Sequence, residues 1–286
     1  MDSTVEERNA LRFYQGVIDQ YEETEDIAVH QRFYQTKRAY NLLNVLMYPG
    51  IENEIARFYK EKKQVPFQLL DEPDVLVSVY EHIFSLMCKN MNKQSKEHKH
   101  LYRVERIQAL RMVEDGHTCS FTSCSLEKSP DDYFMKKDGI LLLELDMPLS
   151  IPYISVNQIL GKNKFSYQEE ILLPPFIEFV SERKNFTERE LNYRDVNNEA
   201  PKGKYNLSIL EHWEYSEKNN VTVEDLKKGC EQVKSVLQRI KAEGEVSEAE
   251  EIFYCEWKKK FQQLIKRMFD ELYYKAGSND FIHKTF

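Results

Sequence analysis

The chain has 286 residues, of which 41% are hydrophobic and 31% are charged, a balance typical of globular proteins rather than disordered or fibrous ones. Its formal net charge of -8 argues against a protein that coats nucleic acid, because such proteins are basic overall. It has no run of about 18 apolar residues, and its polar start, MDSTVEERN, lacks the features of a secretory signal. We therefore expect no membrane partner, and a protein that is cytoplasmic or delivered to a target cell as an effector.

The cysteines predict free thiols in a reducing compartment, because their number is odd and their spacing fits no metal site. They are Cys88, Cys119, Cys124, Cys230 and Cys255. His98 and His100 lie in a lysine-rich stretch without cysteine partners, which is typical of a solvated loop. We expect no bound metal.

The N-terminal region, residues 1–95, is predicted to be helical over residues 5–92, because apolar residues recur at spacings of three and four. One such run comprises Val77, Tyr80, Ile83, Phe84 and Met87. Pro49-Gly50 and Pro66 interrupt the pattern, so we expect several helices rather than one.

The central region, residues 96–212, consists of short extended segments that predict a sheet. The predicted strands cover residues 100–106, 119–123, 139–145, 170–180 and 205–210. The third, GILLLEL, is almost entirely apolar and is therefore expected to be buried. Pro174-Pro175 divides the fourth into two strands, and the fifth is a candidate hairpin partner for it.

The C-terminal region, residues 213–286, is predicted to be helical over residues 223–241 and 246–275. Thr222, with Asp225 three residues later, is typical of a helix N-cap. An apolar stripe on the second helix comprises Phe253, Trp257, Phe261, Ile265, Met268 and Leu272. We expect this stripe to pack in a core rather than to form a groove for a partner.

Three short motifs follow one another in the central region. Arg103 lies in the first predicted strand, Ser123-Cys124-Ser125 ends the second, and QEEILLPP occupies residues 168–175. Each motif alone is common in proteins. Together, in this order and at this spacing, they resemble the arginine, Ser-x-Ser and (Gln/Glu)-x-Glu signature of the mono-ADP-ribosyltransferase superfamily. The resemblance covers residues 100–182, with a candidate closing strand at 203–210.

The resemblance implies an α+β protein with a split β-sandwich core that holds NAD without a glycine-rich fingerprint, flanked by the N-terminal and C-terminal helices. It implies Glu170 as the catalytic carboxylate, with Gln168 two residues before it and Ser123 as a third catalytic residue. Cleavage of the nicotinamide glycosidic bond builds positive charge on the ribose, which a carboxylate stabilises. Since alternate residues of an extended segment share a face, Gln168 and Glu170 are expected to face the reacting ribose, with Glu169 pointing away.

The same resemblance implies a set of NAD-binding residues, with NAD as substrate. They are Arg103, Tyr102, Val104, Ser123, Ser125 and Phe134. Arg103 offers a fork of donors to the pyrophosphate, and Phe134, or its neighbour Tyr133, is a candidate to stack on the nicotinamide. The chain departs from the family at Cys124, where threonine is typical, and at Val104, where glycine is frequent.

Gln168 bears on the acceptor. Family members with Gln-x-Glu resemble the clostridial Rho-modifying exoenzymes, which use asparagine, or the guanine-modifying pierisin-like enzymes. A neutral amide suits an amide or a nucleobase edge better than a cation, so arginine is disfavoured. The basic window at residues 93–111 favours a polyanion and the overall acidity opposes it, which leaves protein and nucleic-acid acceptors both open. Because such enzymes are often toxins, effectors or defence enzymes, an inhibitor or antitoxin protein is a further expected partner.

Two alternatives to a transferase remain. The first is an NAD glycohydrolase on the same scaffold, with water as acceptor. The second is a non-catalytic helical binding module, in which the C-terminal helices hold a partner protein in an apolar groove.

Overall fold

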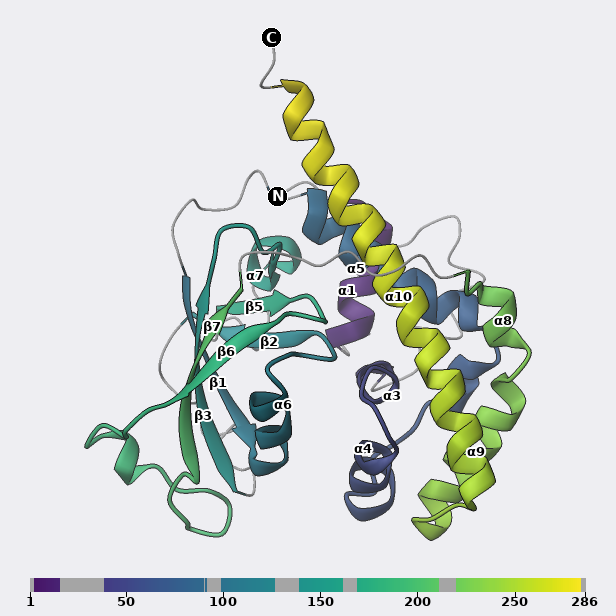
Figure 1. Cartoon of the computed structure of the whole chain (residues 1–286), viewed down its shortest axis with the longest axis horizontal. Helices are drawn as coiled ribbons and strands as arrows, with labels where there is room; N and C mark the ends of the chain where they lie inside the picture. Colours follow the sequence, from purple (N-terminus) through teal and green to yellow (C-terminus); the bar gives the residue numbers. More distant parts are fainter. Residues whose placement is uncertain are drawn as a thin grey trace. The chain divides into compact units, whose positions relative to one another are not determined.

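The structure, a computed structural model, describes residues 3–15, 39–89, 91, 99–126, 139–161, 169–210 and 220–283. The chain divides into two compact units, and most of their helices and strands are labelled in Figure 1. Residues 90–214 form the sheet unit, and residues 2–89 together with 215–286 form the helical unit. The helical regions from the two ends of the chain therefore belong to one unit.

The sheet unit is built on a mixed sheet of seven strands in the order β4-β5-β2-β1-β3-β7-β6. The strands are β1 (Lys99–Arg106), β2 (Thr122–Ser125), β3 (Ile140–Met147), β4 (Ile154–Ser155), β5 (Glu170–Leu173), β6 (Phe179–Arg183) and β7 (Gly203–Ile209). Neighbouring strands run antiparallel except β3 and β7, which run parallel. With helices on both sides of it in the chain, this sheet confirms the predicted α+β class.

The sheet is nearly divided between β1 and β2. β1 pairs with β3 along its whole length, whereas β1 and β2 share only the pair Tyr102–Ser125. On the far side, β2 pairs with β5 at all four of its residues. The two halves, β4-β5-β2 and β1-β3-β7-β6, thus meet at one residue pair. The split expected in the core lies at this junction. Side chains, rather than a continuous backbone ladder, have to link β1 to β2 elsewhere.

Three details of the sheet differ from the prediction. β2 begins at Thr122 and not at Cys119, because Thr118 is bonded through its backbone to the turn at Phe176 and Ile177. The second strand after the proline pair, β6, does pair with β7, but a long loop with the short helix η8 (Glu190–Asn192) separates them. The predicted division at the proline pair is confirmed, but the two strands, β5 and β6, lie in different halves of the sheet.

Short helices complete the sheet unit: η5 (Ile107–Ala109) and α6 (Leu110–Asp115) after β1, and α7 (Val156–Leu160) after β4. They fall below the length at which apolar periodicity can be recognised. α6 ends at Gly116, whose φ of +74° is a left-handed conformation that glycine adopts without strain.

The helical unit contains both long and short helices among the residues that the structure describes. They are α1 (Val5–Gln15), α3 (Ala39–Leu46), α4 (Glu52–Glu54), the π-helix η2 (Ile55–Lys60), η3 (Phe67–Leu70), α5 (Pro73–Lys89), α8 (Val223–Lys227), α9 (Cys230–Glu243) and α10 (Glu248–His283). α5 packs on α10: the ring centroids of Tyr80 and Phe261 lie 5.8 Å apart, and those of Phe84 and Phe269 lie 4.4 Å apart.

This packing decides the use of the apolar stripe on α10. Trp257, Phe261 and Ile265 are buried, which confirms core packing for the middle of the stripe. Phe253, Met268 and Leu272 are only half-buried. Leu264 and Phe269, which the predicted stripe did not include, are buried as well.

Among the helices that the structure describes, none has the length and apolar character needed to cross a membrane. The cysteines are free thiols, as predicted.

Candidate functional site

Glu170 is the first residue of β5 and its side chain faces inward. Only 8% of the residue is exposed, and the three apolar residues that follow it, Ile171, Leu172 and Leu173, are fully buried and anchor the strand. Glu169 immediately before it is exposed and has a left-handed φ of +43°. The strand therefore starts at Glu170, and the carboxylate is held on a rigid element with little contact to water.

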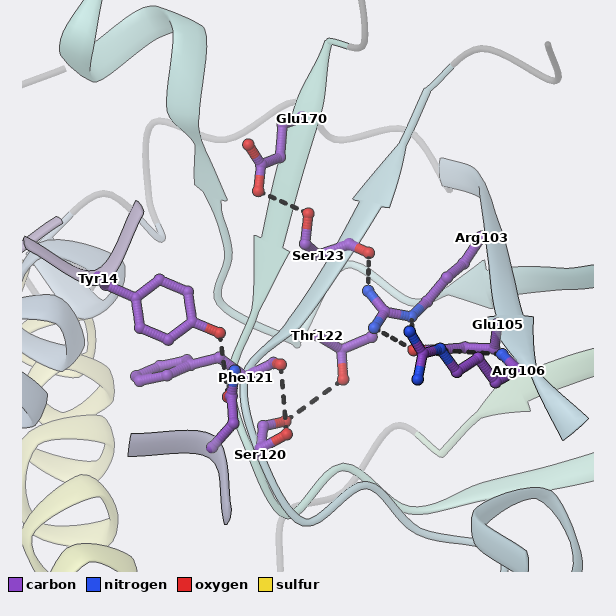
Figure 2. Close-up of polar contacts among 10 residues, drawn as sticks. Tyr14, Arg103, Glu105, Arg106, Ser120, Phe121, Thr122, Ser123 and Glu170 are labelled. Atoms are coloured by element: carbon purple, nitrogen blue, oxygen red, sulfur yellow. Dashed lines mark hydrogen bonds and ion pairs between the residues drawn. The ribbon is translucent and has the colours of Figure 1, made fainter. Parts of the chain in front are cut away.

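Ser123 of β2 provides a partner for this carboxylate. Its hydroxyl donates a hydrogen bond to Oε1 of Glu170 at 2.5 Å (Figure 2). The pairing of β2 with β5 explains the contact, because Ser125 lies opposite Glu170 and Ser123 opposite Leu172. Ser123 is thus the diagonal neighbour of Glu170 on the same face, within reach of a short side chain.

Arg103 of β1 contacts the backbone of Ser123. Its Nη1 donates to the Ser123 carbonyl oxygen, and its Nε and Nη2 donate to Oε1 of Glu105, with 2.7 Å from Nε. Figure 2 shows the carbonyl of Ser123 turned towards Arg103 and its hydroxyl towards Glu170. The guanidinium of Arg103 and the carboxylate of Glu170 therefore contact the same serine, the first through its carbonyl and the second through its hydroxyl, at the junction between the two halves of the sheet.

Cys124, the departure in the Ser-x-Ser motif, lies on the opposite face of β2. Residues alternate along this strand, so that Thr122 and Cys124 are buried while Ser123 and Ser125 are half-buried. Burial raises the pKa of the Cys124 thiol to about 12. The thiol is therefore protonated at neutral pH, and the cysteine fills the core without disturbing the two hydroxyls.

The remaining predicted residues fall in different places. Tyr102 is half-buried and pairs with Ser125 across the junction. The side chain of Val104 is buried in a small cluster with Ile140 and Leu142.

Gln168, Tyr133 and Phe134 lie outside the described residues. Because β5 begins at Glu170 and Glu169 is not extended, strand alternation does not place Gln168.

Glu105 belongs to this arrangement and was missed in the sequence. Its side chain and that of Arg103 are 20% and 23% exposed. The signal was present, because two residues of opposite charge at positions i and i+2 of a strand leave the same face. Such charge pairs are frequent in surface strands, however. This one is part of the site only because β2 places the Ser123 carbonyl next to Arg103.

No family model matches the chain, and no curated protein matches it. The chain is similar to several solved structures of ADP-ribosylating toxins. For Plx2a, an ADP-ribosyltransferase toxin from Paenibacillus larvae, the TM-score is 0.35 and the identity 17%, over 65% of this chain and 96% of the toxin. For the Clostridium limosum C3 exoenzyme the TM-score is 0.36 and the identity 13%, over 73% of this chain and 96% of the exoenzyme. For BECa, an ADP-ribosylating toxin of a binary enterotoxin of C. perfringens solved with NADH, they are 0.35 and 13%, over 65% of this chain and 48% of the toxin.

Proposed function

We propose that the chain is an NAD-dependent ADP-ribosyltransferase that moves ADP-ribose from NAD to a macromolecular acceptor, a protein side chain or a nucleic-acid base. The observation that carries this proposal is the hydrogen bond between Ser123 and Glu170, with Arg103 bound to the backbone of the same serine. The three side chains come from the three motifs that resemble the family's signature.

The chemistry of the proposed reaction requires a buried, oriented carboxylate. The bond between C1′ of the ribose and the nicotinamide nitrogen breaks, and its electron pair leaves with nicotinamide, which becomes neutral. Positive charge develops on the ribose meanwhile, as in glycoside hydrolysis. Glu170 is suited to stabilise that charge, because its side chain is largely withdrawn from water and Ser123 fixes its orientation. The acceptor atom then bonds to C1′ and releases its proton.

Arg103 contacts the carbonyl of the serine whose hydroxyl contacts Glu170, and we assign to its positive charge the pyrophosphate of NAD. Its Nε and Nη2 contact Glu105 and its Nη1 contacts the Ser123 carbonyl, so the pyrophosphate has to share the guanidinium with both groups. Gln168 is the residue that we assign to the acceptor, and NAD is a substrate in this scheme rather than a resident cofactor.

The test is nicotinamide release from NAD by the purified full chain, with Glu170→Gln as the variant. The substitution preserves size and removes the charge, so we expect release to fall about 100-fold or more. Glu169→Gln is the matched control, because Glu169 is adjacent and exposed, and it should keep wild-type activity. Near wild-type turnover by Glu170→Gln would overturn the assignment.

A second measurement names the acceptor class. The chain is incubated with NAD labelled in its ADP-ribose part and, separately, with total protein, RNA or DNA. Label in one of these fractions identifies the class of acceptor. Label recovered only as free ADP-ribose would instead establish an NAD glycohydrolase.

A further inference from the structure

Glu105 holds the side chain of Arg103 along β1. Its Oε1 accepts hydrogen bonds from Nε and Nη2 of Arg103, and its Oε2 accepts one from the backbone nitrogen of Arg106 at 3.3 Å. Both oxygens of the carboxylate are therefore engaged. A planar guanidinium gripped along one edge by a carboxylate has little freedom to rotate.

This orientation matters because of the gap in the sheet. β1 and β2 share one residue pair, Tyr102–Ser125, so the carbonyl of Ser123 lies beyond the ladder between these two strands. Nη1 of Arg103 crosses from β1 and donates to that carbonyl instead. The side chain thus replaces the missing part of the backbone ladder at the residue whose hydroxyl contacts Glu170.

A continuous chain of contacts results, from Glu105 through Arg103 and Ser123 to Glu170 (Figure 2). The ion pair at its start is about four-fifths buried on both sides. Such a pair is screened by salt much less than a surface ion pair, so it can keep the Arg103 guanidinium in a fixed orientation.

We propose that Glu105 is a positioning residue of this site: it orients Arg103 so that the Ser123 backbone is held across the gap and the Ser123 hydroxyl stays on Glu170. The consequence for turnover rests on the proposed function, whereas the contact itself does not. Loss of Glu105 leaves the charge of Arg103 in place and removes the carboxylate that competes with an anion. We therefore expect loss of Glu105 to lower kcat without weakening the affinity for NAD.

The kinetic arm of the test compares Glu105→Ala and Glu105→Gln in the full chain. We expect kcat for nicotinamide release to fall about tenfold or more in Glu105→Ala, since small displacements of a catalytic group are costly. The KM for NAD should stay unchanged or fall. Glu105→Gln keeps an acceptor oxygen for Arg103 and should recover part of the loss. A raised KM with an unchanged kcat would overturn the proposal.

The control variant is Glu182→Gln on β6. Glu182 also forms an ion pair with a basic residue two positions away, Lys184, at 2.5 Å. Its side chain, however, is 68% exposed. Removal of this surface pair should change neither kcat nor KM.

A spectroscopic arm reads the contact without any activity. The Nε–H resonance of Arg103, assigned by its loss in Arg103→Lys, and the backbone amide of Cys124, which shares its peptide with the Ser123 carbonyl, are followed by NMR. Both should shift in Glu105→Ala, at an unchanged melting temperature, and neither should shift in Glu182→Gln. Unchanged resonances in Glu105→Ala would refute the positioning role. A wild-type protein that releases no nicotinamide would refute the proposed function, while this arm would still decide the role of Glu105.

Discussion

At Ser123, the two polar groups of a single residue point to different strands. The carbonyl accepts from Arg103 and the hydroxyl donates to Glu170, so that the serine connects both halves of the sheet. The next residue, Cys124, is turned to the core by strand alternation. A small apolar thiol is well suited to that buried position, which explains why cysteine can stand between two serines here.

The burial of Cys124 leads to a prediction about its reactivity. We expect native Cys124 to resist alkylation by iodoacetamide at pH 8, because only the thiolate reacts and burial raises the pKa of this thiol to about 12. Cys119, which is half-buried, should be modified first. Peptide mapping by mass spectrometry after timed labelling measures both, and rapid labelling of Cys124 in the folded protein would contradict the buried position.

The raised pKa of Cys124 also makes the free energy of unfolding depend on pH. The thiol pKa rises from 9.0 in the unfolded chain to about 12 in the folded one, so the folded state keeps a proton that the unfolded state loses. The contribution of Cys124 to the free energy of unfolding is therefore complete below pH 9 and declines as the pH rises from 9 towards 12.

At the scale of the elements, α8 shows how a local sequence defines a helix start. The hydroxyl of Thr222 accepts from the backbone nitrogen of Asp225, and the Asp225 carboxylate accepts from the backbone nitrogen of Thr222. This reciprocal pattern confirms the predicted N-cap. The hydrogen bond from the Thr222 hydroxyl is the largest cause that lowers the pKa of Asp225 to about 2.

We predict that Thr222→Ala lowers the free energy of unfolding by about 1 kcal/mol, since it removes the capping oxygen. Thr222→Ser keeps the hydroxyl and is the matched control, with a much smaller effect. Because the folded pKa of Asp225 is depressed, its contribution is present above pH 4 and is lost as the pH falls through about 2. Denaturant unfolding at pH 7 measures the two variants, and an equal loss in both would rule out the cap as the cause.

At the scale of the whole molecule, a buried ion pair joins the N-terminal and C-terminal helical regions within the helical unit. Lys258 of α10 contacts Oε1 of Glu54 in α4 at 2.5 Å, although 204 positions separate them in the sequence. Tyr254 donates to the same oxygen at 2.7 Å, whereas Oε2 of Glu54 has no hydrogen-bond partner among the described residues. Burial raises the pKa of Glu54 in spite of the lysine beside it.

We predict that Lys258→Met lowers the free energy of unfolding by about 3–5 kcal/mol, because it leaves a buried carboxylate without its cation. The double variant Glu54→Leu with Lys258→Met should recover most of that loss. Denaturant unfolding is followed by the fluorescence of Trp257, which lies in the core of the same unit, in a Trp213→Phe background.

The pH dependence provides an internal check on this prediction. In Lys258→Met the folded state favours a protonated Glu54. The loss of unfolding free energy relative to the wild type should therefore be smaller at pH 5 than at pH 8. A single variant as stable as the double one at both values would show that the pair has no such role.

The sequence by itself determined the features that depend on neighbouring residues. Apolar periodicity predicted α5 and α10, and it predicted as one helix the segment that the structure divides into α8 and α9. The apolar run predicted β3, and the spacing of a threonine and an aspartate predicted the start of α8. The resemblance of three short motifs to a family signature singled out Arg103, Ser123 and Glu170, whose roles stay predictions. Apart from this resemblance, each of these signals lies within a single predicted element.

Only the tertiary structure decided which elements meet. The parallel pairing of β3 with β7, the single residue pair between β1 and β2, and the union of the two terminal helical regions in one unit could not be predicted. Neither could the contact of Arg103 with the Ser123 carbonyl, nor the ion pair between Glu54 and Lys258. The physical reason is the same in each case: these features arise from contacts between residues far apart in the chain, and local periodicity carries no information about such contacts.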